Sequence, residues 1–255
     1  MNPGYRSDIQ RAARLIRKSQ TAVALTGAGI STPSGIPDFR SAGSGLWEKF
    51  NPMEVASLSA FRYRPQDFFE WVRPLARKIV EAEPNPAHDA LARLERAGQL
   101  AGIVTQNIDD LHGRAGSANV YEIHGHLREA TCVRCYRRYP SERRIERFVE
   151  TGELPRCEEC GGLLKPEVVL FGEQLPYLIV KDAEALISQA DLIIVAGSSL
   201  EVTPAAVFPV QALNSGASMI IVNQDPTYLD DRAEVIFRND VAKVLPDVVE
   251  EVLNG

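Results

Sequence analysis

Short, continuous apolar runs alternate with amphipathic stretches along most of this chain. The runs lack the polar alternation of half-exposed strands, and they are Thr21–Thr26, Gly102–Thr105, Val120–Ile123, Val168–Phe171, Asp191–Ala196 and Met219–Val222. Continuous apolar runs of this length are typical of parallel strands that are buried on both faces. The stretches between them carry apolar residues at helical spacing and predict helices at Arg6–Ser19, Pro86–Ala97, Leu178–Gln189, Ala205–Leu213 and Val241–Leu253. Pro246 should bend or restart the last of these helices.

Strands that alternate with helices predict an α/β fold with a Rossmann-like, doubly wound parallel sheet. Two segments depart from this pattern: 36–83 is rich in prolines and aromatic residues, and 129–165 contains all four cysteines. We therefore expect a discontinuous sheet domain made of 1–35, 84–128 and 166–255. The segment 36–83 is expected to form a helical and loop module, and 129–165 an inserted small zinc-binding module.

The cysteines form two tight pairs, Cys132-x-x-Cys135 and Cys157-x-x-Cys160, separated by 21 residues. Two such pairs present four thiolates and predict a closed, tetrahedral, structural zinc site, although the gap is slightly longer than in the usual ribbon. His126 is a further candidate ligand, but four thiolates already complete the shell. A closed site has no open position for water, so any chemistry must come from residues outside it.

Composition narrows the function classes. The chain of 255 residues is 45% hydrophobic and 24% charged, as in ordinary globular proteins. A net charge of −6 gives no support to direct nucleic-acid binding, while it is compatible with a basic substrate. There is no apolar leader segment and no run of about 18 apolar residues, so no membrane span is expected. We expect a cytoplasmic location, where paired cysteines are more often metal ligands than disulfides.

Polar residues gather where the predicted strands end: at Gly27–Ser31, Gln106–Asp109, His124, Gly197–Ser199 and Asn223–Asp225. The carboxyl edge of a parallel sheet is where ligands bind, and five clusters there suit a long polar ligand such as a dinucleotide. Each cluster also has a simpler explanation: a glycine turn, an Asx turn that caps a helix, or a hydrogen-bonded structural histidine. His88 and His112 are expected to be structural in this way. The G-x-G-x-x-G fingerprint of dehydrogenases is missing.

Taken together, the clusters resemble the sirtuin family of NAD-dependent protein-lysine deacylases. The matching stretches are GAGISTPSGIPDFR at 27–40, TQNIDDLH at 105–112, HG at 124–125, both cysteine pairs, FGE at 171–173, GSSL at 197–200 and VN at 222–223. The resemblance covers the chain from about residue 20 onward, with order and spacing preserved.

The resemblance implies roles for named residues. His124 would be the general base, with Asn107 as the second catalytic residue. The residues implied to bind NAD are Gly27, Ala28, Gly29, Ile36, Asp38, Phe39, Arg40, Gln106, Asn107, Ile108, Asp109, Gly197, Ser198, Ser199, Asn223, Asp225 and Val241. Those implied to bind the substrate peptide, by adding it as a strand, are Val169, Phe171, Gly172, Glu173, Leu200 and Val202. The zinc would hold the small module in place and take no part in bond changes.

The implied reaction transfers an acyl group from a protein lysine to ADP-ribose, consuming NAD and releasing nicotinamide. Relatives that prefer succinyl or malonyl lysine carry a Tyr-x-x-Arg pair, at positions that fall near Val72 and Leu75 here, with Arg73 and Arg77 close by. The pair itself is missing from 61–80. We therefore expect acetyl or other neutral acyl groups to be preferred, because an apolar pocket poorly offsets the desolvation of a carboxylate. The alternatives are protein mono-ADP-ribosyl transfer and a non-catalytic NAD-binding module.

Overall fold

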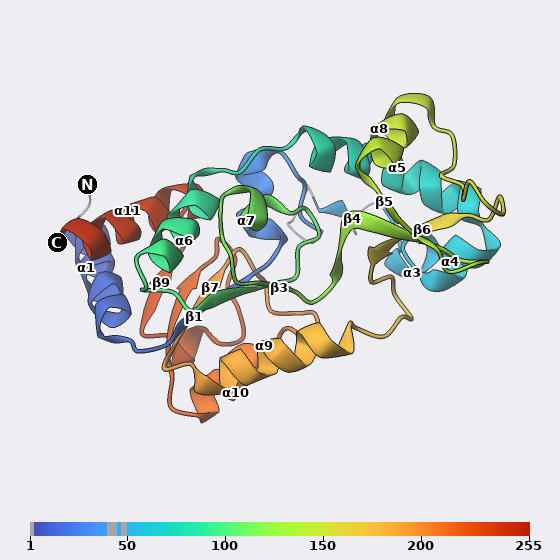
Figure 1. Ribbon diagram of the computed structural model, residues 1–255. Helices are drawn as coiled ribbons and strands as arrows, with labels where there is room; N and C mark the ends of the chain where they lie inside the picture. Colours follow the sequence, from blue (N-terminus) through green and yellow to red (C-terminus); the bar gives the residue numbers. More distant parts are fainter. Residues whose placement is uncertain (1–2, 40–44, 47–49) are drawn as a thin grey trace.

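A six-stranded, wholly parallel sheet forms the centre of the protein. The computed structural model describes residues 3–39, 45–46 and 50–255 (Figure 1). The strand order is β3-β2-β1-β7-β8-β9, which is the Rossmann order with its switch point between β1 and β7. The strands are β1 (Ala22–Thr26), β2 (Gly102–Thr105), β3 (Val120–Glu122), β7 (Leu192–Ala196), β8 (Ser218–Val222) and β9 (Val235–Phe237).

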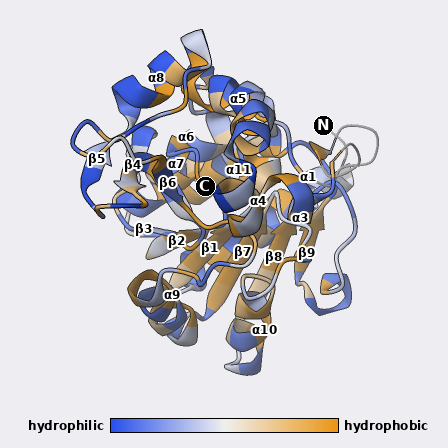
Figure 2. Cartoon of the chain, turned by 90° about the vertical axis from the view of Figure 1, so that its right-hand side faces the viewer, coloured by the Kyte–Doolittle hydropathy of each residue, from blue (hydrophilic) through white to orange (hydrophobic). Residues whose placement is uncertain are grey.

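Helices cover both faces of this sheet, which explains the continuous apolar runs. On one face, Ala22 and Ala24 of β1 share a core cluster with α1 (Pro3–Lys18), α6 (Pro86–Arg96) and α11 (Val241–Asn254). On the other, Val23 and Leu25 pack with α9 (Tyr177–Gln189) and α10 (Val207–Asn214). The strands accordingly carry the hydrophobic colour in Figure 2. The predicted doubly wound α/β fold is confirmed.

The two departures from the pattern lie together, beyond the carboxyl edge of the sheet (Figure 1). The first contains α3 (Pro52–Val55), α4 (Leu58–Tyr63) and α5 (Pro65–Glu81). The second contains α8 (Glu142–Thr151) and an antiparallel sheet of order β5-β4-β6, made of β4 (Gly125–Cys132), β5 (Arg138–Pro140) and β6 (Leu164–Val168). They share an apolar cluster in which the rings of Phe69 on α5 and Phe148 on α8 meet edge to face, with centroids 5.3 Å apart.

The structure differs from the local predictions at two strands and decides between two alternatives at Pro246. A strand was expected at Val168–Phe171, but β6 ends at Val168 and belongs to the small sheet, while Phe171 makes only an isolated bridge with Ser57. Pro166 is tolerated inside β6 because β6 is an edge strand. The short strand β9 was not predicted. The helix α11 runs through Pro246 as one element, without restarting there.

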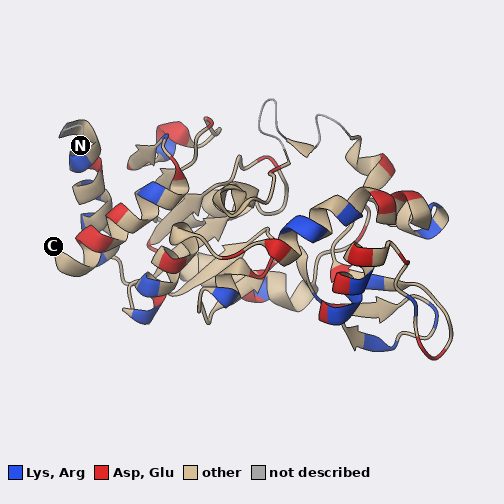
Figure 3. Ribbon diagram, turned by 90° about the horizontal axis from the view of Figure 1, so that it is seen from above, with Lys and Arg blue, Asp and Glu red and all other residues tan. Residues whose placement is uncertain are grey.

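Charged residues of both signs are interspersed over the molecule, most densely in the right-hand part of Figure 3, which holds the two modules. None of the helices in the described residues is long and apolar enough to cross a membrane.

Candidate active site

Three segments of the sheet edge touch one another directly. They follow β1, β2 and β7, which are neighbours in the sheet. The N–H of Gly29 donates to the carbonyl oxygen of Gly197 over 2.9 Å, and the N–H of Gln106 donates to that of Thr26 over 3.0 Å. The side-chain amide of Gln106 donates to Ser198 Oγ over 2.9 Å. Three of the five clusters that were predicted from the sequence to share one edge are therefore in contact.

Gly29 and Gly197 pack so closely that neither position has room for a side chain. A Cβ on Gly29 would lie 2.9 Å from Gly197 Cα, and one on Gly197 would lie 2.1 Å from the Ile30 nitrogen. Gly197 also has a φ of +61°, in the left-handed region. The glycine turn after β1 is followed by two short 3₁₀ turns, Ala28–Ile30 and Thr32–Ser34, in place of a regular α-helix. A helix dipole therefore cannot be invoked at this turn.

Asn107 and Asp109 form a buried polar network with Ser31. The Asn107 amide donates to the carbonyl oxygen of Gly27 and to Ser31 Oγ, both over 3.1 Å. Ser31 Oγ donates to one Asp109 carboxylate oxygen over 2.7 Å, and the other oxygen accepts the N–H of Leu111 over 3.0 Å. Burial raises the pKa of Asp109, while these two hydrogen bonds act in the opposite direction. The hydrogen bond from Leu111 to Asp109 is also the contact expected of an Asx turn that caps the next helix, which is the structural alternative for this cluster.

His124 follows β3 and is held through one ring nitrogen. Its Nδ1 lies 3.0 Å from the carbonyl oxygen of Gln106. A carbonyl oxygen only accepts, so Nδ1 carries the proton and the Nε2 lone pair is free to accept another. Burial lowers the pKa of His124, and the hydrogen bond to Gln106 partly offsets that effect. The imidazole is therefore neutral at ordinary pH, as a general base requires.

The segment after β6 runs beside both His124 and the helical module. The N–H of Val169 donates to the carbonyl oxygen of His124 over 2.8 Å, and the N–H of Phe171 donates to that of Ala56 over 3.1 Å. Phe171 is 38% exposed, and Gly172 follows with a φ of +89°. Glu173 is engaged locally: its carboxylate accepts the N–H of Leu170 and lies 2.9 Å from Lys165 Nζ.

Leu200 and Val202 lie in the loop after β7. The Leu200 side chain is buried in the sheet core, and its backbone has a φ of +57°. The N–H of Leu200 lies 3.3 Å from Ser198 Oγ, which is buried, whereas Ser199 is half-buried. The carbonyl oxygen of Val202 accepts the N–H of Ala206 over 2.9 Å.

The remaining predicted cofactor residues that the structure describes follow β8, begin α11 or lie in the segment after the two 3₁₀ turns. Asn223 follows β8, and its side-chain amide donates to the carbonyl oxygen of Asp225 over 2.8 Å. Val241 is buried at the start of α11. Ile36 is buried in a small cluster that also includes Ile108. Asp38 and Phe39 lie in the loop beyond it and are half-buried, while Arg40 lies outside the described residues.

The four cysteines converge. All four sulfur atoms lie within 4.8 Å of one another, with Cys132 and Cys160 3.5 Å apart and Cys135 and Cys157 3.6 Å apart. Sulfur atoms around a tetrahedral zinc with bonds of about 2.3 Å are separated by roughly 3.8 Å, so the cluster fits that ion. His126 is not part of this cluster.

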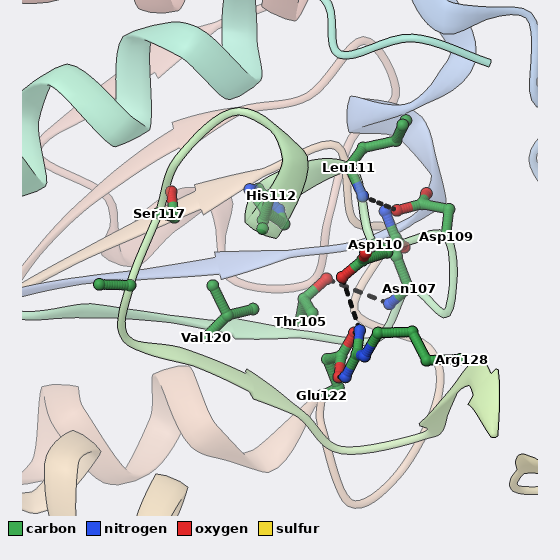
Figure 4. Close-up of a pocket in the computed structure, with 12 residues that line it drawn as sticks. Thr105, Asn107, Asp109, Asp110, Leu111, His112, Ser117, Val120, Glu122 and Arg128 are labelled. Atoms are coloured by element: carbon green, nitrogen blue, oxygen red, sulfur yellow. Dashed lines mark hydrogen bonds and ion pairs between the residues drawn. The ribbon is translucent and has the colours of Figure 1, made fainter. Parts of the chain in front are cut away.

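A polar cavity of about 210 Å³ opens beside the β2–α7 loop, residues 106–110, where α7 is Leu111–Arg114 (Figure 4). His112 lines it and donates to or accepts from Thr26 Oγ1 over 2.9 Å, while Thr26 also bonds Thr105. His112 Nδ1 and Ser117 Oγ are buried in this region and have no hydrogen-bond partner among the described residues.

The structural reading of His88 and His112 agrees with their burial. The two rings lie 4.9 Å apart edge to face, and desolvation lowers the pKa of His88 to about 4 and that of His112 to about 3. Among the polar residues at the site, Ser31, Thr26 and Thr105 were not singled out from the sequence. Ser31 is part of the glycine motif at 27–31, and a hydroxyl so close to the predicted ligand site was the feature from which its role could have been predicted.

Fold and site together define a Rossmann-like α/β protein that carries a four-cysteine module beside the carboxyl edge of its sheet. The Sir2 family model matches residues 27–204, and the chain belongs to this family. It is 47% identical over 246 residues, 96% of each chain, to NAD-dependent protein deacylase 2 of Archaeoglobus fulgidus. It is 43% identical, over 96% of this chain and 95% of the relative, to an NAD-dependent protein deacetylase of Sulfolobus acidocaldarius.

Solved structures agree with this assignment. A Sir2 enzyme from a study of Sir2 mechanism and regulation superposes with a TM-score of 0.90 at 46% identity, covering 96% of this chain and 98% of that one. A Sir2 protein solved with a propionylated peptide gives a TM-score of 0.85 at 40% identity, over 95% and 98% of the two chains. Another, solved with a deacetylated peptide and acetyl-ADP-ribose, gives 0.89 at 41% identity, also over 95% and 98%.

Proposed function

We propose that the protein removes acetyl or other neutral acyl groups from protein lysine side chains, using NAD and yielding nicotinamide, O-acyl-ADP-ribose and free lysine. The observation that carries this proposal is the placement of His124. Its ring is fixed by Gln106, which belongs to the same short loop as Asn107 and Asp109. A neutral base and a buried amide–carboxylate network thus meet at the edge where a Rossmann-like sheet binds its ligand.

NAD, when bound, supplies the ribose carbon that accepts the acyl oxygen and the leaving group that departs. His124 Nε2 would then take the proton of a ribose hydroxyl as the oxygen of that hydroxyl attacks the acyl carbon, and water would complete the release of free lysine. Asn107 and Asp109 orient the nicotinamide half, held by Ser31 in the geometry described above. Ala28 and Gly29 carry only a methyl group and a hydrogen, so their backbone can approach the diphosphate. Ser198, Asn223, Asp225 and Val241 would line the adenosine half.

The preference for a neutral acyl group is supported by the two nearby arginines. Arg73 donates through Nε and Nη2 to the carbonyl oxygen of Val149, over 3.0 and 2.9 Å, and through Nη2 to that of Glu150 over 2.8 Å. Arg77 donates to the same Val149 oxygen over 3.0 Å. Both guanidinium groups are thus directed to the C-terminal end of α8, which supports the preference for an acyl group without a carboxylate. Val72 packs in the apolar cluster of the modules.

The zinc site is part of the proposal. Cys132, Cys135, Cys157 and Cys160 would hold the ion as thiolates and stabilise the module that carries β4 and β6. No step of the reaction passes through it. The substrate peptide would lie against Val169–Glu173 and Leu200–Val202. We also propose that the reaction takes place in the cytoplasm.

The test is incubation of the pure protein with NAD and an acetyl-lysine peptide, following nicotinamide and peptide mass together. One nicotinamide released for each acetyl group lost is the expected result. Nicotinamide release with label transferred onto protein and no deacetylation would instead support mono-ADP-ribosyl transfer. A folded, zinc-loaded protein that releases no nicotinamide would contradict the proposal and leave a binding module.

A further inference from the structure

Arg128 connects three parts of the site that are separate in the sequence. It lies in β4, which leads from His124 into the zinc module, but its guanidinium turns back to the sheet domain (Figure 4). Nη1 lies 2.6 Å from an Asp110 carboxylate oxygen and 2.7 Å from Glu122, and Nη2 bonds the second Glu122 oxygen. Glu122 ends β3, two residues before His124. One side chain therefore joins the β2–α7 loop, the segment of His124 and the small module.

Asp110 needs such a partner because of its backbone. Its φ of +62° puts it among three non-glycine residues with positive φ in the part of the chain that the structure describes. A residue with a Cβ is strained in this region, and such strain persists only where the surroundings hold it. Asp110 follows Asp109 directly, so a change in its backbone would move the carboxylate that bonds Ser31.

The environment makes the ion pair between Arg128 and Glu122 stronger than an ordinary surface pair. The Glu122 side chain is 12% exposed, against 35% for Asp110 and 45% for Arg128. The two bonds to Glu122 form a bidentate fork, the geometry in which arginine binds carboxylates most strongly. Fully exposed pairs, by contrast, contribute little. The pair of Arg147 with Glu153 in the same module, with side chains 71% and 62% exposed, is of that weaker kind.

We infer that Arg128 is a positioning residue: it holds the β2–α7 loop, through Asp110, in the conformation that places Asn107 and Asp109. The loop's role toward NAD is part of the proposed function, and to that extent the inference rests on it. The hydrogen bonds of the Arg128 guanidinium go to Asp110 and Glu122, so its effect on the reaction would be indirect. Its loss should therefore weaken binding of NAD and nicotinamide more than it slows the chemical step.

The test is Arg128→Gln, with Arg147→Gln as matched control, because both remove one guanidinium from an ion pair of the same module. The first readout needs no activity: amide hydrogen exchange at Asn107 and Leu111. Exchange should become at least about fivefold faster in Arg128→Gln, which corresponds to a loss of about 1 kcal/mol in local stability. It should stay unchanged in the control. KM for NAD should rise by a similar factor with kcat within about twofold, and Arg128→Lys should recover part of the loss.

A double-mutant cycle identifies the partner. Glycine adopts a positive φ without strain, so in an Asp110→Gly background Arg128→Gln should change loop exchange by less than about twofold. An undiminished effect in that background would show that Arg128 acts through Glu122 instead, and would overturn the inference. So would unchanged loop exchange in Arg128→Gln. A wild-type protein without NAD-dependent activity would contradict the proposed function alone, since the exchange readout would still decide the role of Arg128.

Discussion

Replacing Gly197 by alanine tests whether contact between the β1 and β7 loops shapes the cofactor site. Two costs can be worked from the structure. A Cβ in the left-handed backbone conformation costs about 1–2 kcal/mol. The new methyl would also lie 2.1 Å from the Ile30 backbone nitrogen, so the backbone must move, and overpacking of this kind costs about 1–3 kcal/mol more. We expect Gly197→Ala to lower the free energy of unfolding by roughly 2–5 kcal/mol.

Gly216→Ala is the matched control. Gly216 has a φ of +94°, but a Cβ there meets nothing within 4 Å, and it lies between α10 and β8, away from the site. Only the backbone cost of about 1–2 kcal/mol should appear. The assay is urea unfolding together with calorimetric titration of NAD into folded protein. The control should keep its NAD affinity, whereas Gly197→Ala should lose at least about tenfold, because the turn that carries Ala28 and Gly29 is displaced.

The result that would refute this reasoning is specific. If Gly197→Ala folds and binds NAD within about twofold of Gly216→Ala, close packing at this point does not set the geometry of the cofactor turn. A loss of stability without a loss of NAD affinity would show that Gly197 is needed for folding but not for the shape of the cofactor site.

Four further predictions concern the base and the metal. His124→Ala should reduce turnover by about 10²-fold or more while zinc content stays unchanged; loss of zinc would break the separation of chemical and structural roles. Because burial lowers the pKa of His124, wild-type activity should fall only as pH drops below about 6.5, and a loss beginning well above that pH would contradict a neutral base. Cys157→Ser should abolish zinc binding by elemental analysis and destabilise the small module, whereas full zinc retention would reject the four-thiolate site. Tyr139→Phe removes a hydroxyl 3.0 Å from Cys157 Sγ and should speed zinc loss to a chelator by about tenfold or more; the exposed Tyr136→Phe should not, and equal rates would exclude the contact.

The sheet was the most predictable part of this structure. Strands such as β2 and β7 are buried on both faces, so their apolar runs follow from burial alone, and the predicted ranges agree closely with the observed ones. Strand β6 was not predictable in this way, because an edge strand containing Lys165, Pro166 and Glu167 has no apolar run. Its pairing with β4 depends on the distant zinc module, which local sequence does not encode.

At the site, the individual residues were easier to predict from the sequence than the hydrogen bonds and ion pairs between them. The glycine turn, Asn107, Asp109 and His124 all follow strands, so a parallel sheet must bring them to one edge. Arg128 gave no such signal: it lies in a charged stretch within β4, and its contact with Asp110 spans 18 positions. The hydrogen-bond partners of Arg73 and Arg77 could not be predicted from the sequence either, because they depend on how α8 packs against α5.

The apolar cluster shared by α5 and α8 has a consequence for protein engineering. Phe61, Phe68 and Phe69 belong to one apolar cluster with residues of the zinc module, in which Phe69 contacts Phe148. Arg73 binds the last turn of α8. The four-cysteine segment is therefore not a cassette that can be excised or exchanged by itself, because its removal would leave an aromatic face of the neighbouring helices in water. A chimera between relatives should carry residues 50–83 and 124–172 over as one transplanted block.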